Sequence, residues 1–81
     1  MRATVLVRPK SGILDPQGEA VERSLRQLGF SVGDARVGRV IDLEVDAPSA
    51  SEARAQVERM CERLLANPLI ESYEIELEGQ A

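Results

Sequence analysis

The stretch LLANPLIESYEIELE, residues 64–78, decides the fold, because it contains a helix end, a turn and a strand. Pro68 cannot continue a helix, and Asn67 before it favours a left-handed residue at which the preceding helix stops. Beyond the turn, apolar and polar residues alternate with the period of two that is typical of a half-buried strand. The apolar residues of this strand are Tyr73, Ile75 and Leu77.

Four carboxylates lie in or beside this strand, namely Glu71, Glu74, Glu76 and Glu78. Paired carboxylates serve acid–base catalysis where burial or a like charge separates their pKa values, and the sequence indicates no apolar pocket around these groups. The period of two instead predicts that they share one solvated face of the strand. A magnesium site that also uses Asp42 or Glu44 is the alternative, although such sites usually need substrate phosphates as well.

The helix before the turn is predicted to begin at Ser49, because Ser49 and Glu52 follow Pro48 with the spacing of a capping box. Its apolar positions recur at helical spacing and are Ala53, Val57, Met60, Cys61, Leu64 and Leu65. Cys61 is the only cysteine of the chain, and histidine is absent. We therefore interpret Cys61 as a small buried hydrophobic residue and not as a nucleophile.

Two earlier segments also have the period of two. In the first, Ala3, Val5 and Val7 share one side before Pro9 closes the strand. In the second, VIDLEVD at residues 40–46, apolar residues alternate with acids. Continuing this alternation backwards would place Arg39 on the core face, so we expect a β-bulge at Gly38. A tight hairpin that splits residues 32–46 into two strands is the alternative.

The stretch LDPQG, residues 14–18, predicts the start of another helix. Asp15 is a good N-cap and Pro16 suits the first helical position, while Gly29 is expected to end the helix in a left-handed conformation. The apolar side of this amphipathic helix comprises Val21, Leu25 and Leu28. The expected i,i+4 ion pairs on its polar side are Glu19–Arg23 and Glu22–Arg26.

The order strand, helix, strand, helix, strand predicts an α+β fold. We expect a two-layer sandwich in which a small, mainly antiparallel β-sheet has both α-helices on one face. The strand order stays open, because the first strand can lie beside the second or leave a place for the third. On the other face of the sheet, Leu6 and Val40 lie among charges, and this face is a candidate for subunit contact.

The 81 residues are interpreted as one domain, residues 1–81, close to the size below which a single core seldom suffices. Oligomerisation is therefore expected. The net charge of −4 and the two aromatic residues, Phe30 and Tyr73, argue against a nucleic-acid partner. Because the chain has neither a long apolar run nor a signal peptide, we expect a soluble, cytoplasmic protein without a membrane partner.

Three segments in this order resemble one known family. They are GILDPQGEAVERSLRQLGF, ARVGRVIDLEVDA and CERLLANPLIESYEIE, which begin at Gly12, Ala35 and Cys61. Together they resemble the PurS family, the small subunit of phosphoribosylformylglycinamidine synthase, a ligase complex of purine biosynthesis. The resemblance runs over nearly the whole chain, from about Val5 to Glu76.

The resemblance implies a homodimer or higher homo-oligomer that has no active site of its own. Such a subunit bridges a large ATP-dependent synthase subunit and a glutaminase subunit, so that ammonia from glutamine reaches the synthase. It also implies no catalytic residues, cofactor or metal in this chain, with ATP and magnesium on the large subunit. An ACT-like dimeric module that binds a small regulatory molecule has the same plan of sheet and helices and is the alternative.

The positions that match the family's motifs are Asp15, Pro16, Gly18, Gly38, Asn67, Pro68 and Tyr73, together with Arg36, Arg39 and Glu71. Helix capping, a β-bulge and helix termination give most of the first set local explanations. Arg36, Arg39 and Glu71 have no such explanation. We predict that these three residues make contacts across subunits, since Arg pairs with carboxylates through two hydrogen bonds and is enriched at interfaces.

Overall fold

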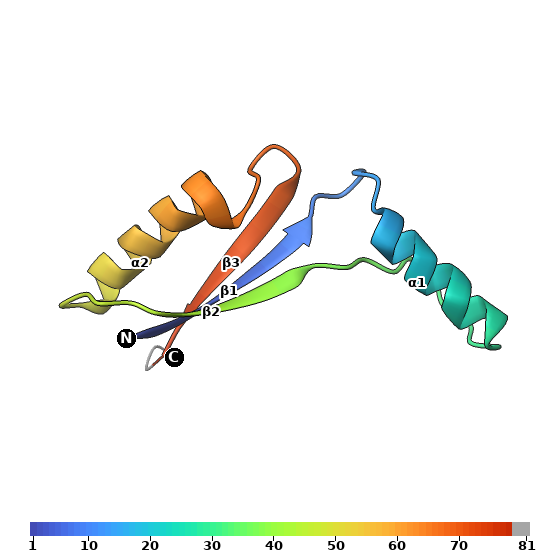
Figure 1. Cartoon of the computed structure of the whole chain (residues 1–81), viewed down its shortest axis with the longest axis horizontal. Coiled ribbons are helices and arrows are strands. Elements are labelled where there is room, and N and C mark those ends of the chain that lie inside the picture. Colours follow the sequence, from blue (N-terminus) through green and yellow to red (C-terminus); the bar gives the residue numbers. More distant parts are fainter. Residues whose placement is uncertain (79–81) are drawn as a thin grey trace.

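The computed structural model describes residues 1–78 (Figure 1). Its elements are β1 (Arg2–Pro9), α1 (Pro16–Gln27), β2 (Arg39–Glu44), α2 (Ala50–Met60), the π-helical turn η1 (Cys61–Leu65) and β3 (Glu71–Leu77). β1 is the central strand and pairs antiparallel with β2 on one side and β3 on the other. The predicted α+β class and antiparallel sheet are confirmed, and the strand order that the sequence left open is β2-β1-β3.

The core lies between the sheet and α2. Ala3, Val5 and Val7 of β1 face α2 and are buried, as predicted. The other buried residues are Val45, Ala53, Val57, Cys61, Ala66 and Leu77. Cys61 is therefore the buried hydrophobic residue that the sequence predicted. Leu64 is not part of the core and is 83% exposed, because the wider π-helical turn of η1 moves it off the apolar side of α2.

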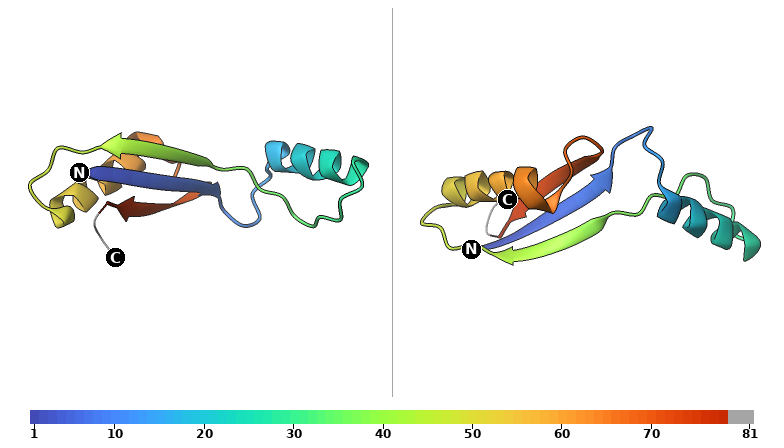
Figure 2. Two further views of the ribbon diagram at one scale, coloured as in Figure 1. Left: turned by 90° about the horizontal axis from the view of Figure 1, so that it is seen from below. Right: turned by 45° about the horizontal axis from the view of Figure 1, so that its top comes forward.

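α1 begins and ends as predicted, but it does not lie on the sheet. Asp15 caps the helix by accepting a hydrogen bond from the N–H of Gly18, Pro16 occupies its first position, and Gly29 has a φ of 95°. The whole helix projects beyond the end of the sheet at which β1 ends and β2 begins (Figures 1 and 2). The structure thus differs from the predicted sandwich in one respect, because only α2 covers the apolar face of the sheet.

This projection makes the chain long and leaves apolar surface without cover. The extents are 50 × 26 × 17 Å and the radius of gyration is 15.8 Å. A compact chain of this length has a radius of gyration of about 12 Å. Leu28 on the apolar side of α1 is 73% exposed, and Val21 and Phe30 are exposed as well. Helical periodicity correctly predicted an apolar side for this helix, but it does not specify which surface covers that side.

β2 pairs with β1 in unbroken register, from Arg39 opposite Val7 to Glu44 opposite Arg2. The predicted bulge at Gly38 is therefore wrong, and so is the hairpin, because residues 30–38 form no strand in the described part of the chain. Arg39 does lie on the core face, but at the end of the sheet, where its side chain reaches solvent. The need for glycine at position 38 has a different explanation. A Cβ at this position would lie 2.2 Å from the carbonyl oxygen of Val7.

Candidate interaction site at the end of the sheet

The three predicted contact residues come together where β1 ends, β2 and β3 begin and η1 leads into its turn. We call this region the junction and define it as residues 9–15, 36–39 and 65–71. α1 leaves the sheet from the junction (Figure 2). It contains Arg36, Arg39 and Glu71 and, among the other motif positions, Asp15, Gly38, Asn67 and Pro68.

Arg39 and Glu71 form an ion pair through two hydrogen bonds across the end of the sheet. Arg39 Nη1 lies 2.7 Å from Glu71 Oε2, and Arg39 Nη2 lies 3.0 Å from Glu71 Oε1. Nη2 also donates to the carbonyl oxygen of Leu65, the last residue of η1. The hydrogen bond to Glu71 raises the pKa of Arg39. The pKa of Glu71 is lowered by Arg39 first and then by the N–H of Asn67, so the junction favours the charged pair.

Glu71 does not share a face with the other carboxylates of β3. It lies opposite Pro9 and on the same face as Tyr73, whereas the other face carries Glu74, Glu76 and Glu78. The prediction of one solvated carboxylate face is therefore wrong for Glu71, because its position in the sequence differs from those of the others by an odd number. Among residues 1–78, no group of three Asp, Glu, Cys or His side chains is placed to hold a metal ion.

The turn between η1 and β3 is built on Asn67. Its Oδ1 accepts a hydrogen bond from the N–H of Leu69 at 3.1 Å, and its own N–H donates to Glu71 Oε1 at 2.7 Å. Its carbonyl oxygen accepts from the N–H of Glu71, also at 2.7 Å. The predicted left-handed Asn67 is wrong, because glycines alone have a positive φ among residues 1–78. The helix ends instead at the extended residue Ala66, and the Asn67 side chain folds the turn.

Asp15 and Arg36 tie the base of α1 to the sheet. Asp15 accepts hydrogen bonds from the N–H of Gly18 at 3.0 Å and from the N–H of Val37 at 2.9 Å. The bond from Val37, followed by the bond from Gly18, lowers the pKa of Asp15. The Arg36 guanidinium donates to two carbonyl oxygens at the end of β1. Arg36 therefore has local partners that the sequence did not indicate, and its contact with another subunit stays a prediction.

Two motif positions outside the junction have packing roles. A Cβ on Gly18 would lie 2.2 Å from the carbonyl oxygen of Ala35, so the first turn of α1 packs directly against this backbone. The hydroxyl of Tyr73 donates to Glu62 Oε1 at 2.9 Å and links β3 to η1. This bond and desolvation raise the pKa of Tyr73 to about 12.

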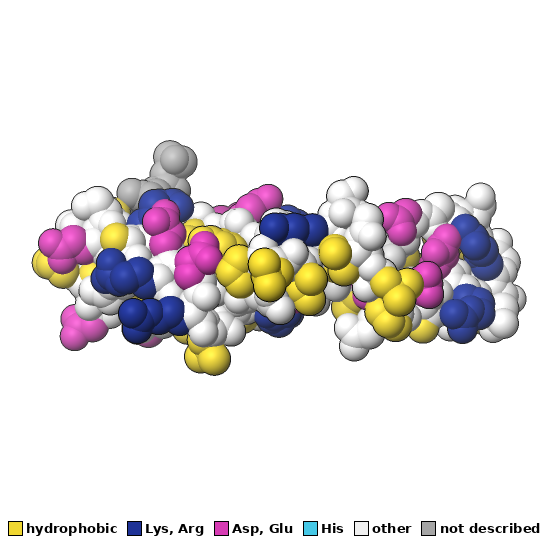
Figure 3. Space-filling view, turned by 90° about the horizontal axis from the view of Figure 1, so that it is seen from above, with side chains coloured by type: hydrophobic (Ala, Val, Ile, Leu, Met, Phe, Trp, Pro, Cys, Tyr) yellow, Lys and Arg dark blue, Asp and Glu magenta, His cyan; other side chains and the backbone are white. Residues whose placement is uncertain are grey.

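The outer surface of the junction is apolar. The loop before α1 contributes Ile13 and Leu14, and the turn before β3 contributes Leu69, which is 84% exposed, and Ile70. We call these four residues the apolar row. The N–H of Lys10 donates to the carbonyl oxygen of Ile70 at 2.8 Å, which holds the two loops side by side. Figure 3 shows hydrophobic side chains in a row across the middle of this face.

Beside the apolar row lies a hollow of about 250 Å³, whose lining includes Ile13, Leu14 and Ile70 together with Asp15, Arg39 and Glu71. The junction therefore combines exposed apolar side chains with an ordered charged pair, which suits a protein contact. Sequence reasoning missed the apolar row, because its residues lie in loops, outside any helical or strand period. Their position in loops next to helix and strand ends was the signal available.

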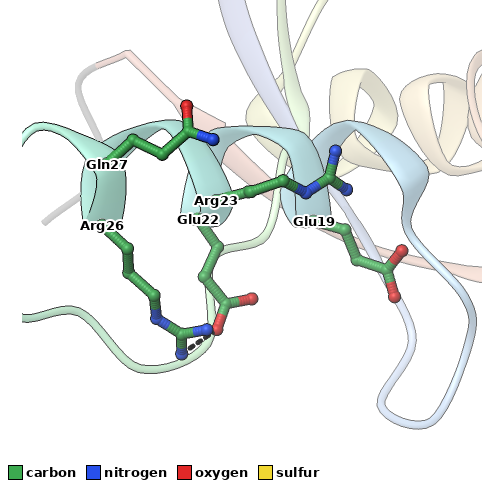
Figure 4. A pocket seen from close by; sticks show the side chains of 5 residues that line it. All are labelled: Glu19, Glu22, Arg23, Arg26 and Gln27. Atoms are coloured by element: carbon green, nitrogen blue, oxygen red, sulfur yellow. Dashed lines mark hydrogen bonds and ion pairs between the residues drawn. The ribbon is translucent and has the colours of Figure 1, made fainter.

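A second, shallower hollow lies on the polar side of α1. Figure 4 shows the side chains that line it, which are Glu19, Glu22, Arg23, Arg26 and Gln27. Glu22 and Arg26 form the predicted ion pair, and Arg26 also donates to the carbonyl oxygen of Val32. The predicted pair of Glu19 with Arg23 is not among the ion pairs of residues 1–78. These charged groups form a solvated helix surface, and the junction is the stronger candidate site.

The fold and the junction define a small α+β interaction module, in which charged side chains order the loops and apolar side chains are left for contact. The sequence model of one family, described as phosphoribosylformylglycinamidine (FGAM) synthase, PurS, matches residues 2–79. The chain belongs to this PurS family. Along residues 1–78, neither helix has the length and apolar character needed to cross a membrane.

Relatives and solved structures agree with this assignment. The chain is 42% identical over 76 residues to the phosphoribosylformylglycinamidine synthase subunit PurS of Archaeoglobus fulgidus, covering 93% of this chain and 95% of that one. It is similar to the crystal structure of Methanocaldococcus jannaschii PurS, with a TM-score of 0.83, 37% identity, and coverage of 99% and 98%. A chain of the PurLQS structure from Thermotoga maritima matches with a TM-score of 0.85, 39% identity and 93% coverage of both chains.

Proposed function

We propose that this chain is the small subunit of a phosphoribosylformylglycinamidine synthase and acts as an adaptor without an active site of its own. The match of the family over residues 2–79 carries this proposal. The likeness to a chain of the Thermotoga maritima PurLQS structure supports a role inside a complex. In the proposed complex, which acts in the cytoplasm, the chain bridges a large synthase subunit and a glutaminase subunit. ATP and magnesium bind the large subunit.

A second copy of the chain is the proposed cover for α1. Val21 of this helix is exposed, as are Leu28 and Phe30 directly after it, and the radius of gyration of 15.8 Å reflects a helix that packs against no sheet of its own chain. A two-fold pair in which each copy covers the α1 of the other buries both apolar sides at once. Each Å² of apolar surface removed from water contributes roughly 25 cal/mol, which favours the homodimer.

Reconstitution tests the adaptor. The large subunit and the glutaminase from the same organism are mixed with and without this chain, and glutamine-dependent product formation is followed together with the mass of the complex. We expect coupled activity and the assembled mass only when the chain is present. An ammonium salt in place of glutamine serves as the control, because it shows that the large subunit is active by itself. Unchanged activity and mass without the chain contradict the proposal, and so does turnover by the purified chain alone.

A further inference from the structure

The sheet has a second face, opposite α2, that no helix of residues 1–78 covers. The left view of Figure 2 looks onto this face, with α2 behind the strands. We call it the open face. At its centre Leu6 of β1 lies opposite Val40 of β2, and Val40 is 61% exposed. A hollow of about 360 Å³ lies beside this pair and extends toward Arg8 and Arg39.

Most of the net charge of the protein lies on the open face. Strand alternation places on this face five carboxylates, namely Asp42, Glu44, Glu74, Glu76 and Glu78. Two cations, Arg2 and Arg8, lie on the same face. Counted by side chains alone, five negative and two positive charges leave −3, compared with −4 for the whole chain, and the N-terminal ammonium, 3.5 Å from Glu44, offsets one of the negative charges. The apolar pair thus lies between two charged regions, since the carboxylates extend from it along the strands away from the junction, whereas Arg8, Arg36 and Arg39 line the hollow on its junction side.

The carboxylates of this face that have no ion pair within residues 1–78 are Asp42 on β2 and Glu76 and Glu78 at β3. On β2, Asp42 accepts a hydrogen bond from the hydroxyl of Thr4 at 2.8 Å. Glu74 lies 3.3 Å from Arg8 Nη1. Glu76 stands opposite Thr4, and no ion pair within residues 1–78 includes it. Glu76 therefore presents an exposed, uncompensated charge beside the apolar pair.

We propose that the open face docks a basic protein surface, in which Lys and Arg side chains lie along β3 next to an apolar contact, and that this surface belongs to one of the two larger synthase subunits. The inference rests on the proposed function and adds the surface that makes the contact. Charge complementarity carries the choice of partner. A second copy stacked on this face through a two-fold axis would place net negative charge against net negative charge, and nucleic acid phosphates would meet the same repulsion.

The open face is too small to form a whole protein interface by itself, so we expect it to be one part of a larger contact. Seven residues of strand at about 3.3 Å each and three strands at about 4.8 Å give roughly 300 Å². A standard interface buries about 800 Å² on each partner. The hollow at the junction end connects the open face to Arg39, so the same partner is expected to reach the junction. The acidic residues then act mainly on the association rate and on the salt dependence of binding.

The test measures the affinity of the chain for the large subunit and for the glutaminase separately, at low and high salt. Glu76→Lys reverses the uncompensated charge, and Val40→Ser removes the apolar contact without changing the charge. Glu58→Lys is the matched control, because Glu58 is an exposed carboxylate on α2, on the other side of the sheet. Circular dichroism melts and the mass of the free chain show whether each variant keeps its fold and its self-association, and Glu76→Gln replaces Glu76→Lys if that variant is unstable.

We expect one of the two subunits to bind the wild-type chain more weakly as salt rises. For that subunit, Glu76→Lys raises the dissociation constant about tenfold at low salt and less at high salt, whereas Val40→Ser raises it about fivefold at both. Glu58→Lys leaves it unchanged. If the wild-type chain binds while Glu76→Lys and Val40→Ser bind equally well, this inference is wrong and the adaptor role stands. If Glu76→Lys changes self-association instead, the open face is a contact between copies and the inference is also wrong. A wild-type chain that binds neither subunit contradicts the proposed function itself.

Discussion

Replacing Gly38 with alanine is expected to destabilise the junction by about 2 kcal/mol. The new Cβ would lie 2.2 Å from the carbonyl oxygen of Val7, 3.3 Å from the Val7 carbonyl carbon and 3.4 Å from Arg8 Cα. All three are backbone atoms of the central strand, so no side-chain rotation relieves the clash. β1 and β2 must therefore separate locally by about 1 Å, and overpacking of this kind typically costs about 1–3 kcal/mol.

Gly33→Ala is the matched control for this substitution. Gly33 lies in the same segment, its φ is not in the left-handed region, and a Cβ there would meet nothing within 4 Å. At such a position alanine restricts the unfolded chain and stabilises the protein by about 0.4–1 kcal/mol.

The assay is thermal and urea unfolding of both variants and the wild type at one protein concentration, because self-association makes the melting temperature depend on concentration. A loss of about 2 kcal/mol lowers the melting temperature by roughly 8–16 °C in a domain of this size. Equal stability of Gly38→Ala and Gly33→Ala would refute the reasoning, because it would show that the close approach of β2 to β1 imposes no steric limit at Gly38.

Three further substitutions test the junction, the uncovered helix and β3. Glu71→Gln removes the ion pair with Arg39 and is expected to cost about 1 kcal/mol at neutral pH. Because the pKa of Glu71 is held below its ordinary value of 4.5, this stabilisation is complete above pH 4.5 and is lost as the pH falls through the lowered pKa, so the unfolding curves of wild type and variant converge in acid. Leu28→Lys is expected to weaken self-association about tenfold, as measured by sedimentation, without reducing the helical signal. Glu62→Gln is expected to lower the pKa of Tyr73 from about 12 toward 10 in an ultraviolet titration, because the carboxylate partner of the phenol is lost.

Each of these has its own control. Glu74→Gln removes a more exposed carboxylate that pairs with Arg8 at 3.3 Å, and its effect on stability should be smaller than that of Glu71→Gln at every pH. Gln27→Lys adds the same charge as Leu28→Lys one residue earlier on α1. If both lysine variants dissociate alike, charge and not the apolar side explains the change. A phenol that titrates at the same pH with and without Glu62 contradicts the assigned hydrogen bond.

The sequence predicted the elements of this fold well because each has a local cause. The caps Asp15 and Ser49 accept hydrogen bonds from the N–H groups that the capping patterns indicated. Alternation placed the buried residues of β1 correctly, and Pro68 marked the turn before β3. These outcomes depend on residues within a few positions of one another, which is the range over which sequence patterns act.

The sequence did not predict the charged part of the junction, because its partners are distant in the chain. Arg39 and Glu71 are 32 residues apart, and Asp15 and Val37 are 22 apart. Without the strand order, nothing indicated that these groups meet. The missing strand order also explains the wrong prediction of a bulge at Gly38. A bulge was expected because an arginine on the core face appeared too costly, whereas the core face ends before Arg39, and its guanidinium pairs with Glu71 in reach of solvent.

α1 shows why an amphipathic pattern leaves the covering surface open. The apolar side of α1 has the periodicity of a helix that packs on a core. For a single chain, the simplest expectation is that its own sheet covers this apolar side. Residues 10–15 and 28–38 instead carry the helix away from the sheet, and Asp15 and Arg36 fix that departure with hydrogen bonds to Val37 and to the end of β1. These bonds hold α1 at a defined angle to the sheet, with its apolar side uncovered by its own chain. We therefore propose that the apolar side of α1 is covered by a second copy in the assembled protein, which leaves the junction and the open face for the larger partner proposed above.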